Sequence, residues 1–96
     1  ALDYLVSRPD VDADRMAVTG CSGGGAITTY IAVFDSRLKA AAPGCFINSF
    51  RTLFTGPTAD SEMSWPRFLA SGLDNADFFE AAAPLPWLLM ATTEDY

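Results

Sequence analysis

Short uninterrupted apolar runs alternate along this chain with stretches whose apolar residues recur every three or four positions. The runs cover residues 15–19, 39–43 and 87–91. Apolar runs without polar alternation are typical of strands buried on both faces of a parallel sheet. The alanines of the second run are poor strand formers, so its assignment rests less on propensity than on pattern.

Helical spacing precedes the first run and separates it from the second. Residues 1–7 place leucine and valine on one face, and Pro9 ends this helix because the residue before a proline avoids helical geometry. A second helix is predicted over 26–34, with its apolar face packed on the sheet. That face consists of Ala26, Ile27, Tyr30, Ile31 and Phe34. Strands alternating with helices predict an α/β fold with parallel strands and flanking helices.

Residues 46–82 form an irregular insert between the second and third strands, broken into short helices by glycine and proline. Asp74 and Asp77 are candidate caps of these helices. The insert is rich in aromatic residues, and four of them are candidate walls of a substrate pocket, namely Phe50, Phe54, Trp65 and Phe68. We expect at least half of these four to pack into the core instead.

Composition excludes some partners and implies no cofactor. The 96 residues suit one domain, and 12 acidic residues against 6 basic ones give a net charge of −6. The basic residues are scattered singly, so we expect no nucleic-acid partner, and no apolar stretch is long enough to span a bilayer. Cys21 and Cys45 match neither a metal motif nor a disulfide scaffold. We expect two buried thiols there in preference to a disulfide.

The sequence GCSGG, residues 20–24, carries the clearest chemical signal. It satisfies G-x-S-x-G between a predicted strand and a predicted helix, which is the context of a nucleophile elbow. Glycine at positions 20 and 24 would relieve the collision between strand and helix, and Gly25 would let the helix approach the sheet. Ser22 would then be presented at the sheet edge, and the N–H of Gly23 would face a developing oxyanion.

Other interpretations of these glycines are a plain turn and a phosphate-binding loop. The phosphate loop fails in detail, because no Gly-Lys-Ser/Thr follows and Ser22 occupies the second glycine position of G-x-G-x-x-G. A serine nucleophile needs a base and an orienting acid. Asp95 follows the third apolar run, where such an acid belongs, and Glu94 is its alternative. The chain contains no histidine.

The chain resembles the α/β-hydrolase superfamily over nearly its whole length. The resemblance rests on DRMAVTGCSGGGAI (14–27), DSRLKAAAP (35–43) and PLPWLLMATTEDY (84–96). The nearest branch is that of the acetyl xylan esterase and dienelactone hydrolase-like enzymes, which border on the prolyl oligopeptidase-like peptidases. The resemblance implies that 1–96 is an internal fragment of a single α/β-hydrolase domain.

Carried over by position, the resemblance assigns a catalytic triad role to two residues. It implies Ser22 as the nucleophile, Asp95 as the triad acid and the backbone N–H of Gly23 as an oxyanion donor. The family histidine and the second oxyanion donor fall outside the sequence, so we expect the 96 residues alone to show almost no turnover.

The expected function is therefore that of a serine carboxylic-ester hydrolase. Its substrate would be a small-molecule or carbohydrate ester, and its partner would be the remainder of the parent hydrolase domain. The alternatives are a peptidase of the prolyl oligopeptidase type, which uses the same catalytic parts, and a non-catalytic α/β binding module, which the missing histidine favours.

Overall fold

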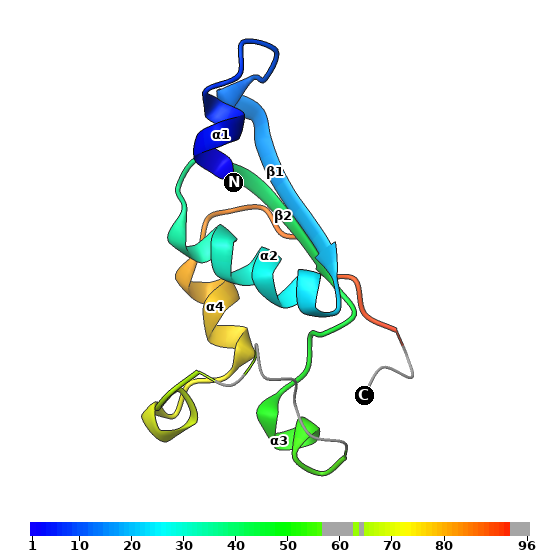
Figure 1. Cartoon of the computed structure of the whole chain (residues 1–96). Helices are drawn as coiled ribbons and strands as arrows, with labels where there is room; N and C mark the ends of the chain where they lie inside the picture. The colour runs from blue at the N-terminus through cyan, green and yellow to red at the C-terminus, as the bar shows by residue number, and fades with distance from the viewer. Residues whose placement is uncertain (57–62, 64, 93–96) are drawn as a thin grey trace.

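The computed structural model describes residues 1–56, 63 and 65–92. Helices and strands alternate in it as the sequence predicts, which confirms the α/β fold (Figure 1). In chain order the elements are α1 (Leu2–Val6), the 3-10 turn η1 (Ala13–Arg15), β1 (Met16–Cys21), α2 (Gly23–Phe34), β2 (Leu38–Gly44), α3 (Phe50–Leu53), the 3-10 turn η3 (Leu69–Ser71) and α4 (Asn75–Ala81). No helix among the described residues is long and apolar enough to cross a membrane.

β2 lies at the centre of the parallel pairing. On one side it pairs with β1, and Val18 stands opposite Ala41 in this register. On its other side runs the third predicted strand, which forms isolated parallel bridges at Trp87 and Met90 instead of a continuous strand. The Met90 N–H donates to the Pro43 carbonyl at 3.1 Å. All three apolar runs thus lie side by side and parallel.

The buried face of α2 consists of small residues, so the predicted face is only partly right: Ala26 is buried and Tyr30 and Ile31 pack against the core clusters, but Ile27 and Phe34 do not. Ile27 is 52% exposed and Phe34 is 67% exposed. The buried residues of the helix are Gly25, Ala26, Thr28, Thr29 and Ala32. Small side chains let the helix backbone come close to a strand that is itself rich in alanine, and larger side chains at the interface would hold the two apart.

The sheet is covered on one face only by the described residues, whereas the sequence predicts burial on both. Met16 is buried, but Ala17 and Thr19, which alternate with it along β1, are exposed. The open face carries a hollow of about 410 Å³ lined by residues 17–19, 40–42 and 86–88. Figure 1 shows α2 lying across the opposite face.

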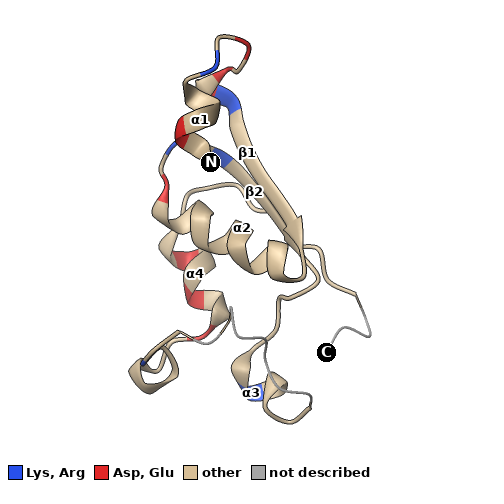
Figure 2. Ribbon diagram, viewed as in Figure 1, with Lys and Arg blue, Asp and Glu red and all other residues tan. Residues whose placement is uncertain are grey.

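The end of the sheet remote from the carboxyl termini of the strands carries most of the ion pairs. Arg37 bonds to Asp35 in the turn between α2 and β2, and it reaches Asp3 of α1 at 2.8 Å. Its guanidinium donates to the Asp35 carboxylate and lowers the pKa of that carboxyl to about 2. Asp12 accepts from Arg15 in the acidic turn before β1, where Asp12 and Asp14 are exposed. The pair between Arg37 and Asp3 links α1 to the turn before β2, far from the elbow (Figure 2).

The insert is held together by the cap of α4. The Asp74 carboxylate accepts from the Asn75 N–H at 2.7 Å and, across the insert, from the Phe50 N–H of α3 at 3.0 Å. Asp77 completes a capping box by accepting from the Asp74 N–H. Both predicted caps are confirmed, and one carboxylate links two helices that lie far apart in the sequence.

Candidate active site

Ser22 stands at the sharp turn between β1 and α2 in a backbone conformation that residues other than glycine avoid. Its φ is 58° and its ψ is −126°. The turn is held from both sides: the Ser22 N–H donates to the Gly44 carbonyl at 2.9 Å, and its own carbonyl accepts from Gly25 at 2.8 Å and Ala26 at 3.1 Å. A left-handed serine costs free energy, and such residues cluster at functional sites.

Two glycines make this turn sterically feasible. A Cβ at Gly20 would overlap the Gly24 carbonyl and lie 3.0 Å from Thr28 Oγ1. A Cβ at Gly25 would overlap the Gly44 carbonyl, which confirms that this glycine allows the helix to approach the sheet. A Cβ at Gly24 would meet nothing within 4 Å. The prediction that glycine at position 24 relieves the collision is therefore wrong, because a side chain at position 20 would meet the backbone of residue 24, whereas one at position 24 would meet nothing.

The strand and the helix on either side of Ser22 carry no charged side chain. Gly23 begins the twelve-residue helix α2, whose first N–H groups have no acceptor within the helix. Residues 16–34 contain no charged side chain (Figure 2). A negative charge that developed beside Ser22 would therefore meet backbone N–H groups and the positive end of the helix dipole. Ser22 is half-buried, and its hydroxyl makes no hydrogen bond to the described part of the chain.

The predicted acid cannot be placed, because Asp95 and its alternative Glu94 lie outside the described residues. The structure does describe the segment that leads to them, up to residue 92. The Cys45 N–H donates to the Met90 carbonyl at 3.0 Å, next to the Gly44 carbonyl that accepts from Ser22. The chain therefore passes Met90 at the carboxyl edge of the sheet, where Ser22 also lies.

Cys21 and Cys45 form a disulfide, so the prediction of two buried thiols is wrong. Their Cα atoms are 5.1 Å apart. The parallel register brings them together, because Cys21 lies opposite Gly44 and Cys45 is the next residue. The two cysteines are 24 positions apart in the sequence, and this spacing by itself does not predict that they pair. The bond links the residue before Ser22 to the residue before the insert.

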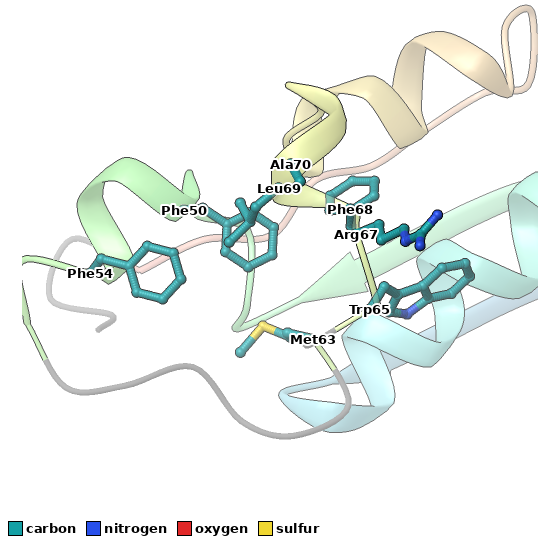
Figure 3. A pocket seen from close by; sticks show the side chains of 8 residues that line it. All are labelled: Phe50, Phe54, Met63, Trp65, Arg67, Phe68, Leu69 and Ala70. Atoms are coloured by element: carbon teal, nitrogen blue, oxygen red, sulfur yellow. The ribbon is translucent and has the colours of Figure 1, made fainter.

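All four aromatic residues that the sequence marked as candidate walls line one cavity in the insert (Figure 3). It measures about 320 Å³. Its lining consists of Phe50, Phe54, Met63, Trp65, Arg67, Phe68, Leu69 and Ala70. Phe50 and Phe68 also belong to the apolar cluster of the insert, whereas Phe54 is 59% exposed. Sequence reasoning missed Arg67, which follows a proline and belongs to no motif.

The geometry of the elbow agrees with the comparison to known proteins. The prolyl oligopeptidase family matches residues 1–95. The chain belongs to this family. Its fold is accordingly that of the α/β-hydrolases, of which the described strands and helices form a part.

A curated relative extends the comparison to one named protein. The protein described as "Putative hydrolase YtaP" from Bacillus subtilis (strain 168) is 42% identical over 45 residues. The match covers 47% of this chain but 15% of the relative, so the chain spans a small part of that protein. No solved structure matches this chain.

The glycines of the elbow make a matched set for testing the turn. In the full-length protein we expect Gly20→Ala and Gly25→Ala each to lower the free energy of unfolding by about 2 kcal/mol or more, since each added methyl overlaps a backbone carbonyl. Gly24→Ala is the control and should change it by less than about 0.5 kcal/mol. Urea unfolding measures all three. Equal destabilisation by Gly24→Ala would contradict this account of the turn.

The disulfide should contribute to stability. We expect the double substitution Cys21→Ala, Cys45→Ala to lower the free energy of unfolding by about 3 kcal/mol, because the crosslink closes a loop across 24 positions in the unfolded chain. Denaturant unfolding with and without a reducing agent measures this difference. The reducing agent should lower the unfolding midpoint of the wild type through this bond, and the double variant should lack that effect. Identical unfolding midpoints for the oxidised wild type and the double variant would count against the crosslink.

Proposed function

We propose that this chain carries the nucleophile of a serine hydrolase that cleaves carboxylic esters, with Ser22 as that nucleophile. The observation that carries the proposal is the left-handed backbone of Ser22 between a strand and a helix. That conformation is the one a nucleophile elbow requires, and it holds the hydroxyl at the carboxyl edge of a parallel sheet. Membership of the prolyl oligopeptidase family supports a hydrolase.

In the proposed reaction the Ser22 oxygen attacks the ester carbonyl and its proton passes to a histidine outside these residues, which contain none. The carbonyl oxygen becomes an oxyanion that accepts from the Gly23 N–H at the start of α2. Collapse expels the alcohol, which takes up the proton, and water then releases the acid from the acyl-enzyme. Asp95 would orient the histidine, and the course of the chain past Met90 at the same sheet edge supports that role.

The aromatic cavity of the insert is the proposed place of the acyl or alcohol part of the substrate. Its walls come from two segments, α3 and the stretch around η3, and both follow the carboxyl end of β2 in the chain. Ligands of open α/β sheets bind outside the carboxyl ends of the strands. Its volume of about 320 Å³ lies within the range of small-molecule sites. A small-molecule or carbohydrate ester, as in the acetyl xylan esterase-like enzymes, remains the substrate class we propose.

The remainder of the parent hydrolase domain is the proposed partner of the open sheet face. Parallel sheets in α/β proteins are covered on both faces. Here Leu88 is 62% exposed, and the hollow beside it is lined almost entirely by apolar side chains. Helices from the same domain would bury that surface.

A peptidase of the prolyl oligopeptidase type is the second candidate, and the family match favours it. The elbow serves both reactions equally, because both pass through an acyl-enzyme on serine. A non-catalytic binding module would need no left-handed serine, so the conformation of Ser22 argues against that third interpretation.

Labelling of the full-length protein by a fluorophosphonate probe tests the nucleophile. We expect Ser22→Ala to abolish labelling and to lower kcat for 4-nitrophenyl acetate by about 10³-fold or more. Ser36→Ala is the matched control, since Ser36 is an exposed serine beyond the opposite end of α2, and it should leave both signals unchanged. Labelling that persists in Ser22→Ala would overturn the assignment.

Substrate preference separates the two hydrolase candidates. The wild-type protein is assayed with 4-nitrophenyl acetate, acetylated xylan oligosaccharides and a proline-containing peptide nitroanilide. A kcat/KM that is at least about tenfold higher for the acetylated oligosaccharides than for the peptide is expected for the esterase. The reverse order would support the peptidase.

A further inference from the structure

We propose that the insert cavity binds a molecule that joins an aromatic ring to a carboxylate, with the guanidinium of Arg67 bonded to the carboxylate. The rings of the lining would take the aromatic part. The inference rests on the proposed function in one respect, namely that the occupant is part of the substrate. It adds the chemical class of that part.

Arg67 is a cation that has no carboxylate partner among the described residues of an acidic chain. The net charge is −6, and Arg8, Arg15 and Arg37 each bond to an aspartate. The side chain of Arg67 forms no ion pair or hydrogen bond with the described residues. It is also the one charged side chain among the described residues that line the cavity. A guanidinium offers paired donors whose spacing matches the two oxygens of a carboxylate.

The backbone at Arg67 adds an independent observation. Its φ is 65°, and the only other non-glycine residues with positive φ in the described chain are Ser22 and Cys45. Both of those lie at the elbow, so this conformation otherwise occurs only beside the proposed nucleophile and its crosslink. A long side chain in the left-handed region costs free energy that glycine or asparagine would largely avoid. An arginine in this conformation therefore indicates a use for its side chain.

The rest of the cavity suits a ring. The ring centroids of Phe50 and Phe68 are 5.9 Å apart in an edge-on arrangement, and those of Phe50 and Phe54 are 5.8 Å apart. Trp65 closes another side, with its ring 4.8 Å from that of Tyr30 on α2. A bound ring can make the same edge-on and offset contacts with these walls. Figure 3 shows the Arg67 side chain extending beside Trp65 and Phe68.

Paired ligands of equal shape test the charge. The full-length protein is titrated by calorimetry with 3-phenylpropanoate and with its neutral amide, 3-phenylpropanamide. We expect the wild type to bind the acid about tenfold more tightly than the amide, the difference that one charge-assisted pair supplies. Arg67→Gln should remove that preference, and Arg67→Lys should keep part of it.

Arg51→Gln is the matched control, because Arg51 is exposed, forms no ion pair with the described residues and does not line the cavity. It should retain the wild-type preference. Equal affinity for acid and amide, no measurable binding of either, or the same loss in Arg51→Gln and Arg67→Gln would each overturn the proposal.

Binding requires no turnover, so this test is separable from that of the hydrolase. The Ser22→Ala variant should show the same preference for the acid as the wild type. Fluorophosphonate labelling that is unchanged in Ser22→Ala would contradict the proposed function but would not affect the binding result. Normal labelling of Ser22 together with equal binding of acid and amide would defeat this inference alone.

Discussion

The backbone contact between the start of α2 and the end of β2 is the constraint on which the rest of the structure depends. Gly25 lies so close to the Gly44 carbonyl that a single methyl would separate them, and the same carbonyl accepts the N–H of Ser22. This closeness sets the angle at which the helix leaves the strand. The positive φ of Ser22 is the consequence, because the chain must turn sharply from β1 into a helix that packs on the neighbouring strand.

The same contact organises the carboxyl edge of the sheet. Cys45 follows Gly44, the last residue of β2, and its disulfide to Cys21 and its hydrogen bond to Met90 join the end of β2 to both flanking segments. The proposed nucleophile thus lies in a region tied by backbone hydrogen bonds and one covalent bond, where small movements are resisted. Preorganisation of this kind is what stabilisation of an oxyanion by backbone N–H groups requires.

The insert is built on a different principle. Its helices are too short to be stable alone, and aromatic contacts and the Asp74 cap hold them together. A chain of ring contacts runs from Tyr30 on α2 through Phe78 and Phe68 to Phe50 on α3. None of the described residues that line the cavity belongs to the elbow, so binding specificity can change without altering the elbow.

The sequence by itself determined the α/β order, the three parallel segments and the elbow, since apolar runs, helical spacing and glycine positions are local signals. Tertiary structure decided which glycines are needed, that small residues of α2 face the sheet, and that Cys21 meets Cys45. It also brought Arg67 to an aromatic cavity. Each of these features depends on which segments of the chain lie next to each other. The register of the strands and the approach of the helix arise from packing between segments that are distant in the sequence, so local patterns do not predict them.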